Sequence, residues 1–413
     1  MTRAPLTLIK PFCALRPGPG RAAEVLAPPY DVLSSAEARE RAKGKPWSFL
    51  HVSKAEIDLD PAIDLHHPAV YAKAAENLRR MIDAGVLARD ETPGYYVYRL
   101  TWRDRVETGF AAVASLRAYA ENRIRKHELT TPVKEDDRVR QIEAVGSQTG
   151  PVMLAYPEAP AIEALLACAA KRAPEVDVVA DDGVRHELWP IHDEASLAAL
   201  TRAVDDLPAL YIADGHHRSA AALRVAEARG VRDGYFLAVL LPEHEMTILD
   251  YNRVLLDLNG LTPDEVLRAI GRRYTVEPSD GPVRPARADE VGMVLSGRWH
   301  RLSLKPEIAD KAARSGDAVA RLPVTLLADN VIEPIFGVTD PRRDKRIDFV
   351  GGGRGLEALE RLVKSGAAAV AFALYPTEMR DLMVVADAGA IMPPKSTWFE
   401  PKLADGMVSH ILD

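Results

Sequence analysis

The chain has 413 residues, of which 47% are hydrophobic and 27% are charged. This composition is typical of a folded globular protein and excludes a disordered chain, and at roughly 150 residues per domain the length predicts two or three domains. The net charge of −7 disfavours broad binding to duplex nucleic acid, which needs a basic face, but it is compatible with a small anion pocket. The two cysteines, Cys13 and Cys168, are far apart in the sequence, so a disulfide framework and a cysteine-based zinc site are excluded.

The start of the chain, MTRAPLTLIK, lacks the apolar region of a signal peptide. The longest apolar run, at about residues 367–375, is much shorter than the roughly 18 residues that a membrane span needs. We therefore expect a cytoplasmic protein without a membrane partner.

Residues 1–92 are predicted to form a loop-rich segment with helices. The run from Ser34 to Glu37 is typical of a capping box at the start of a helix. Residues 70–84 show a helical pattern that Gly85 closes.

Residues 93–260 are predicted to form a mixed α/β core. The first two strands, rich in aromatic and β-branched residues, indicate a hairpin. Short strand-like and helix-like segments then alternate, and a further pair of strands is expected around Pro242. The segments, in chain order, are 95–102, 108–116, 152–156, 161–173, 176–180, 195–204, 210–213, 219–229, 235–241 and 246–249.

Residues 261–413 are predicted to form a C-terminal α/β region that packs on this core. The run from Thr262 to Glu265 has the N-cap, the first-turn proline and the N3 glutamate of a helix start. Strands are expected within 291–304 and at 347–350 and 369–374, helices at 322–328 and 356–364, and an irregular tail at 392–403.

The run Asp214-Gly215-His216-His217-Arg218, between a buried strand and an alanine-rich helix, carries the sharpest chemical signal. An Asp-Gly turn followed by a helix N-terminus attracts anions, and the imidazoles and the guanidinium add donors for a phosphate. Asp214 fits such a pocket if it binds a metal ion or positions a substrate hydroxyl. The alternative is a plain strand–turn–helix junction in which Asp214 is the N-cap and the histidines are incidental.

A second signal is His127-Glu128, which lies within a stretch of basic and acidic residues. Glu128 could act as a general base for a hydroxyl or as a metal ligand. The alternative is a solvated run of charges, which is the commoner fate of such a sequence.

Two further segments hold candidate ligand-binding residues. Asn252 and Arg253 follow Tyr251 at the end of a predicted strand, where polar groups often face a cleft, and a simple turn is the alternative. Lys395 could reach an anionic ligand, but the proline before it excludes a Walker A loop, which needs glycine there. We expect both segments to converge on the cleft at Arg218.

At these motifs the chain resembles a widespread prokaryotic family that is described as a domain of unknown function. The matching stretches run in order along nearly the whole chain, and the resemblance by itself implies no activity. They are 27–32 (APPYDV), 48–52 (SFLHV), 127–128, 211–218, 250–253 and 392–399 (MPPKSTWF).

A more distant resemblance links the strand and the Asp-Gly-His-His-Arg run to the ParB/sulfiredoxin-like superfamily, and within it to the free-serine kinases. The resemblance implies that Glu128 is the base for the serine hydroxyl. It also implies that the residues from Gly215 to Arg218 hold the nucleotide phosphates. The interval between the two motifs is longer here than in the compact kinases, which an inserted helix and strand at about 161–180 would explain.

From these features we expect a mixed α+β protein with a ParB/sulfiredoxin-like core and N- and C-terminal elaborations. The expected function is phosphoryl transfer between a nucleotide, ATP or ADP, and a small hydroxyl-bearing metabolite such as free L-serine, with Mg²⁺ near Asp214. A non-catalytic switch that binds CTP or ATP, and a phosphatase or other hydrolase acting on a phosphorylated metabolite, are the alternatives. The catalytic residues are then Glu128, His217 and Asp214. The phosphate or nucleotide ligands are Gly215, His216, His217, Arg218, Asn252, Arg253 and Lys395.

Overall fold

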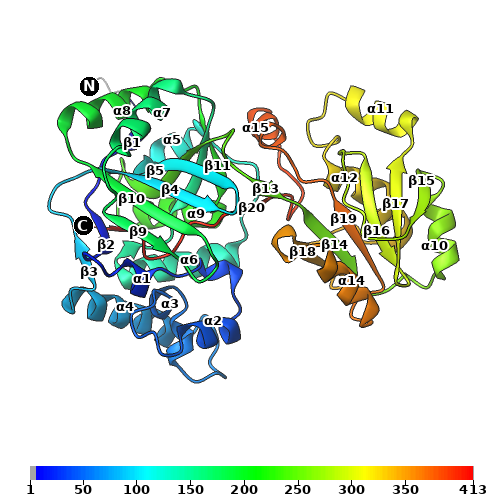
Figure 1. The fold of residues 1–413 in the computed structure, drawn as a ribbon, viewed down its shortest axis with the longest axis horizontal. Helices are drawn as coiled ribbons and strands as arrows, with labels where there is room; N and C mark the ends of the chain where they lie inside the picture. Colours follow the sequence, from blue (N-terminus) through cyan, green and yellow to red (C-terminus); the bar gives the residue numbers. More distant parts are fainter. Residues whose placement is uncertain (1–5, 413) are drawn as a thin grey trace. The chain divides into compact units, whose positions relative to one another are not determined.

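The computed structural model describes residues 6–412. In it the chain forms two compact units (Figure 1). Unit 1 comprises the chain up to Met246 together with the segment from Pro401 onward, and unit 2 comprises Thr247–Glu400. The three predicted parts, 1–92, 93–260 and 261–413, do not coincide with these units, because the last segment of the chain pairs with N-terminal strands. Within residues 6–412 no helix is both long and apolar enough to cross a bilayer.

A large mixed sheet forms the centre of unit 1. Its strands follow the order β6-β11-β8-β12-β5-β4-β10-β9, with β1 also paired to β5. Both parallel and antiparallel pairs occur, since β11 is parallel to β6 and antiparallel to β8. The predicted mixed α/β class is therefore confirmed. The strands are β1 (Ile9–Lys10), β4 (Tyr95–Trp102), β5 (Arg105–Ser115), β6 (Ile124–Arg125), β8 (Val152–Tyr156), β9 (Val176–Val179), β10 (Arg185–Ile191), β11 (Leu210–Asp214) and β12 (Tyr235–Pro242).

Helices cover this sheet because their apolar sides share its core. Ile162 of α7 (Pro160–Ala169), Leu200 of α8 (Glu194–Asp205) and Tyr119 of α5 (Leu116–Ala120) belong to one cluster with buried strand residues such as Leu154 and Ile212. Burying such side chains removes apolar surface from water, which is the main force that holds the layers together.

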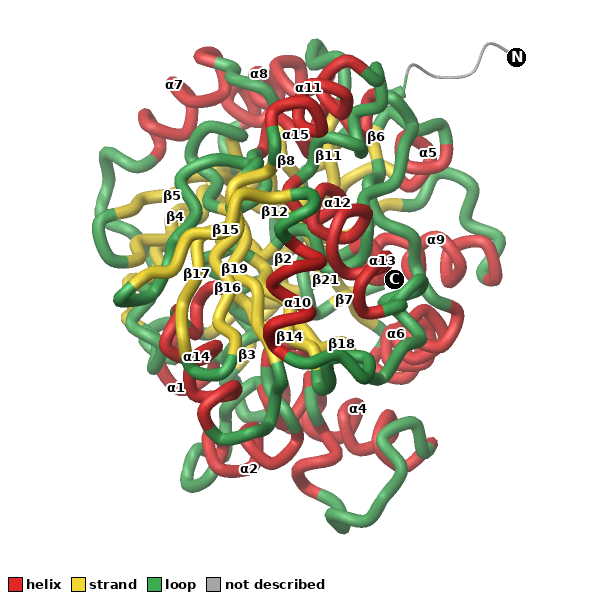
Figure 2. Tube along the Cα trace, turned by 90° about the vertical axis from the view of Figure 1, so that its right-hand side faces the viewer, coloured by secondary structure: helices red, strands yellow, loops and turns green. Residues whose placement is uncertain are grey.

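The N-terminal helices gather at one end of unit 1, as both views show for α2 and α4 (Figures 1 and 2). The capping box predicted at Ser34 is present at the start of α2 (Ser35–Ala42), and α4 (Pro68–Asp83) ends just before Gly85, which adopts a positive φ. A second, small sheet lies in unit 1, in the order β3-β2-β21-β7. It pairs the C-terminal strand β21 (Ser409–Ile411) with β2 (Ala14–Pro17), β2 with β3 (Leu87–Arg89), and β21 with β7 (Ser147–Gln148).

Unit 2 contains a six-stranded sheet in the order β15-β17-β16-β19-β14-β18. Helix α14 (Leu356–Lys364) packs on one face through Leu359 and contacts Val254 and Ala371 within one apolar cluster. The helix start predicted at Thr262 is confirmed, with a capping box before α10 (Pro263–Ile270). The strands are β14 (Tyr251–Leu255), β15 (Tyr274–Ser279), β16 (Glu290–Leu295), β17 (Arg298–Leu304), β18 (Ile347–Gly351) and β19 (Val370–Leu374).

One local expectation is corrected, and one helix was not predicted. The segment predicted to pair with β12 around Pro242 is strand β13 (Ile248–Leu249), which belongs to unit 2 and pairs with β20 (Trp398–Phe399). The charged stretch after Glu128, for which no element was predicted, forms helix α6 (Pro132–Val145), of which Gln141 and Ile142 are the buried residues. So few buried positions leave little hydrophobic periodicity to detect in the sequence.

Candidate functional site

The Asp-Gly-His-His-Arg run forms a tight junction between strand β11 and helix α9 (His216–Ala228). The strand ends at Asp214, and Gly215 has φ 101°, a conformation that side chains with a Cβ rarely adopt. A Cβ at Gly215 would also lie 2.9 Å from Nε of Arg218. The helix begins without a side-chain cap at Gly215. This junction therefore presents a helix N-terminus at the end of a buried strand, the geometry that suits an anion.

The loop with Glu128 lies against this junction because β6 runs parallel to β11, with Ile124 opposite Leu210. Two backbone N–H groups of the loop then donate hydrogen bonds to the two histidines of the junction. His127 N donates to Nε2 of His216 at 3.4 Å, and Thr131 N donates to Nε2 of His217 at 3.2 Å. These bonds lie on either side of Glu128, so the paired histidines hold the loop that carries it.

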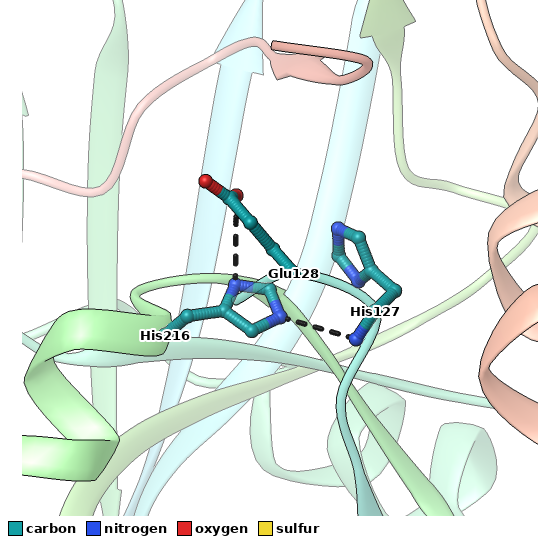
Figure 3. Close-up of side chains that lie close together, drawn as sticks. All are labelled: His127, Glu128 and His216. Carbon is teal, nitrogen blue, oxygen red and sulfur yellow. Dashed lines mark hydrogen bonds and ion pairs between the residues drawn. The ribbon is translucent and has the colours of Figure 1, made fainter. Parts of the chain in front are cut away.

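The carboxylate of Glu128 approaches His216 on the side opposite this hydrogen bond (Figure 3). Its Oε2 atom lies 4.0 Å from Nδ1 of His216. Burial lowers the pKa of His216 well below its ordinary value, and the neighbouring His127 lowers it further, so the ring is neutral. Because Nε2 accepts a hydrogen bond, the proton of the neutral ring is on Nδ1 and faces Glu128. Glu128 itself is 40% exposed, which leaves its carboxylate accessible to a substrate.

His127, Glu128 and His216 also form a possible metal-ligand set, since one ligand atom from each lies within 4.8 Å of the others. Burial lowers the pKa of His127 to about 4, so both rings are neutral, as metal ligands must be. However, Nδ1 of His216, the atom that faces Glu128, carries the ring proton and cannot bind a metal ion in this state. Moving the proton to Nε2 would bring two donors, Nε2–H and the backbone N–H of His127, against each other. The donor set therefore suits an oriented carboxylate better than a metal ion.

Asp214 is held between two cations of unit 1. Nη2 of Arg218 donates to Oδ2 of Asp214 at 3.0 Å, and Nη1 of Arg218 donates to the carbonyl of Pro151. Nζ of Lys402 lies 3.8 Å from the same carboxylate oxygen. Burial would raise the pKa of Asp214, but the charges of Lys402 and Arg218 outweigh it and hold this pKa well below its ordinary value.

This arrangement bears on the metal expected at Asp214. A magnesium ligand must offer its negative charge to the ion, whereas the Asp214 carboxylate is already neutralised by Arg218 and Lys402. Asp214 therefore does not fit the role of a magnesium ligand.

Sequence reasoning missed Lys402, which enters the site from the C-terminal segment of the chain. A basic residue directly after the MPPKSTWFEP stretch was the only signal for it. Its side chain is 16% exposed and adds a positive charge beside the junction.

The other predicted ligand residues, Asn252, Arg253 and Lys395, belong to unit 2. The structure brings the two segments that carry them together, since Nη2 of Arg253 donates to the carbonyl of Pro394 at 3.2 Å. The amide of Asn252 serves the fold, because it donates to Asp250 at 2.5 Å and accepts from the backbone N–H of Leu374 at 2.9 Å. Convergence of these segments on Arg218 remains a prediction.

Comparison with models of protein families identifies the family of the chain. Residues 9–325 match the model of DUF1015, described as a protein of unknown function. The chain belongs to the DUF1015 family. This result confirms the expected family of unknown function, and the match covers the β11–α9 junction, the Glu128 loop and β14 of this DUF1015 protein.

No curated protein matches the chain. Several solved structures show a weak likeness at 12% identity. A conserved hypothetical protein from Pyrococcus furiosus has a TM-score of 0.34 over 71% of this chain and 93% of its own. A free serine kinase variant in complex with ADP has a TM-score of 0.34 over 72% of this chain and 88% of its own. C-terminally truncated SbnI from Staphylococcus aureus has a TM-score of 0.37 over 72% of this chain and 86% of its own. These values are too low to assign an activity.

Proposed function

We propose that this DUF1015 protein transfers a phosphoryl group between a nucleotide, ATP or ADP, and a small hydroxyl-bearing metabolite, with free L-serine as the first candidate. The observation that carries the proposal is the accessible Glu128 carboxylate, whose loop is held at the N-terminus of α9 by the buried His216 and the half-buried His217. A general base beside an anion-binding helix end is the arrangement that phosphoryl transfer to a hydroxyl needs. We also infer that the sheet of unit 1 is a ParB/sulfiredoxin-like core.

In this proposal the phosphates lie at the N-terminal end of α9. The helix end and the Lys402 ammonium supply positive charge, which phosphoryl transfer requires at the oxygens of the transferred group. Arg218 acts indirectly, because its guanidinium bonds Asp214 and the carbonyl of Pro151. A magnesium ion, where the reaction uses one, is brought by the nucleotide phosphates.

Glu128 receives the proton of the acceptor hydroxyl. As the hydroxyl oxygen forms its bond to phosphorus, the bond from phosphorus to the bridging oxygen of the nucleotide breaks and its electron pair stays on that oxygen. The proton passes to the Glu128 carboxylate. The proton on Nδ1 of His216 faces this carboxylate and orients it. The hydrogen bonds from the backbone N–H groups of His127 and Thr131 hold the loop with Glu128 at the helix end.

The test is incubation of the full chain with L-serine and γ-labelled ATP, and in parallel with β-labelled ADP. A phosphotransferase forms labelled phosphoserine in at least one of the two reactions. A change of shape or oligomeric state on addition of CTP or ATP, without phosphoserine, would instead support a nucleotide-binding switch. Release of phosphate from phosphoserine without nucleotide would support a hydrolase.

A further inference from the structure

A small cavity lies within unit 1 and shares Arg218 with the β11–α9 junction. The positions open to the centre of a water molecule fill about 30 Å³, which is more than the ~10–15 Å³ that one bound water needs. Tyr30, from the APPYDV stretch that the proposed function leaves without a role, lines this space. The other residues of its wall that carry the argument are Ser53, Arg138, Gly150 and Asp405.

One wall of the cavity is an acid without a cationic partner. Asp405 is 2% exposed, and its Oδ2 accepts a hydrogen bond from Tyr30 N at 3.2 Å. Within residues 6–412 no cation lies within ion-pair distance of this carboxyl, and burial raises its pKa to about 7 despite the charge of Arg218. The second oxygen, Oδ1, borders the empty space at Gly150, since a Cβ at Gly150 would lie 3.5 Å from it. The cavity thus offers a carboxyl oxygen to a donor.

Arg138 of α6 supplies hydrogen-bond donors to the same cavity. Its Nε and Nη2 both donate to Oδ2 of Asp137, and its guanidinium carbon lies 4.0 Å from the centre of the Tyr30 ring. Nη1 makes no hydrogen bond within the part of the chain that the structure describes, so donors remain for a carboxylate. Tyr30 contacts Arg138 through its ring and Asp405 through its backbone N–H, so one residue links the cation and the acid.

A third polar group of the wall is unsatisfied. Oγ of Ser53, at the end of α3 (Leu50–Ser53), is buried near Asp405 and has no hydrogen-bond partner of normal geometry among residues 6–412. A buried hydroxyl in this state is unfavourable, and a ligand in the cavity would satisfy it. The rest of the wall includes Ile142, Ala222 and Phe236, which limit the size of a ligand side chain.

We propose that this cavity binds a small α-amino acid as its zwitterion, with the carboxylate on Arg138 and the ammonium on Oδ1 of Asp405. A simple anion would lie against the acid of Asp405, and a simple cation would leave the donors of Arg138 unused, whereas a zwitterion pairs with both. The ammonium also has a donor for Oγ of Ser53. The inference goes beyond the proposed function, because it involves neither Glu128 nor a nucleotide.

The experiment uses L-alanine as the probe, because it has no hydroxyl and cannot accept a phosphoryl group. Its binding to the full-length protein is measured by calorimetry without nucleotide. The comparison ligands are L-lactate, which lacks the ammonium, L-alaninol, which lacks the carboxylate, and L-phenylalanine, whose side chain is too large. We expect L-alanine to bind, and each of the other three to bind more weakly by about tenfold or more.

Two variants locate the bound amino acid. Gly150→Ala places a methyl group in the cavity, 3.5 Å from Cδ of Arg218 and from Oδ1 of Asp405, which is ordinary contact. It should keep the wild-type melting temperature and lose affinity for L-alanine by about tenfold or more, as should Asp405→Asn, which removes the charge. Gly281→Ala of unit 2, where a Cβ meets no atom within 4 Å, is the matched control and should bind normally.

The ligand comparison on the wild type decides the proposal even where a variant folds poorly. Absence of L-alanine binding, or equal binding of L-lactate or L-alaninol, would overturn it. Unchanged L-alanine binding in a stable Gly150→Ala would place the ligand elsewhere and would also overturn it. Displacement of L-alanine by inorganic phosphate at lower concentration would make the cavity a simple anion site instead. L-alanine binding in a protein that forms no phosphoserine would refute the proposed function alone.

Discussion

Glu128 and His216 lie with a 4.0 Å separation between Oε2 and Nδ1, although Glu128 belongs to the loop after β6 and His216 begins helix α9. The hydrogen bond from His127 N to the opposite ring nitrogen sets the tautomer, so the Nδ1 proton faces the carboxylate. The same contact explains why a His-Glu motif and a His-His motif occur together. The first presents the carboxylate, and the second holds the loop that carries it.

Replacement Glu128→Gln should remove the base while keeping the shape of the loop. We expect turnover to fall by about 10²–10⁴-fold, with nucleotide affinity and melting temperature unchanged, in labelled-phosphate assays and calorimetry. Glu121→Gln, which alters an exposed glutamate paired with Arg117, is the matched control and should keep full turnover. Near-normal turnover in Glu128→Gln would assign Glu128 to the surface of the loop.

Replacement His217→Ala should loosen the loop, because Thr131 N loses its acceptor. The hydrogen bond contributes about 1 kcal/mol, so turnover should fall several-fold while nucleotide affinity changes little. Hydrogen exchange at the Thr131 amide should become faster. His217→Gln offers a side-chain oxygen to the same N–H and should restore part of the turnover. A loss confined to nucleotide affinity would instead make His217 a phosphate ligand.

Replacement Lys402→Met should weaken nucleotide binding. A charge-assisted hydrogen bond is worth about 1.5–3 kcal/mol, so we expect a loss of roughly tenfold or more in calorimetry, and Lys171→Met at an exposed position should bind normally. Unchanged nucleotide affinity in Lys402→Met would exclude this lysine from the phosphate site.

Replacement Arg218→Ala should act on stability. We expect it to lower the free energy of unfolding by about 1.5–3 kcal/mol in urea titrations, because Asp214 and the Pro151 carbonyl each lose a hydrogen-bond donor.

Asp405 should make stability depend on pH. It is 2% exposed and accepts a hydrogen bond from Tyr30 N at 3.2 Å. Burial raises its pKa to about 7, against the opposing charge of Arg218. In the unfolded chain the carboxyl ionises near its ordinary value of 3.8, so the folded state binds the extra proton between about pH 4 and 7. Stability contributed by this proton is therefore present at low pH and is lost as pH rises through 7.

The measurement is the melting temperature of Asp405→Asn and the wild type at pH 5 and pH 8. The amide cannot ionise and still offers an oxygen to Tyr30 N, so the stability of the variant relative to the wild type should increase by roughly 2–3 kcal/mol between pH 5 and pH 8. Asp104→Asn, at an exposed position, is the control. An equal pH dependence in Asp405→Asn and the wild type would show that Asp405 is ionised in the folded state at both pH values.

The amino-acid sequence by itself determined the features that depend on neighbouring residues. The capping boxes at Ser34 and Thr262, the turn at Gly215 and most strands of the large sheet follow from short patterns, because capping, positive φ and strand alternation are local properties. The Asp-Gly-His-His-Arg run also marked the candidate site directly.

Only the tertiary structure decided which distant groups meet. Helix α6 buries few residues and gives little periodic signal, and β13 pairs with β20 of unit 2 rather than with β12, because register depends on the whole sheet. Lys402 reaches Asp214 because β21 pairs with β2 and returns the C-terminal segment to unit 1. The missing counter-charge of Asp405 is likewise a property of its surroundings, since burial and long-range partners are set by packing and not by the residues beside it in the sequence.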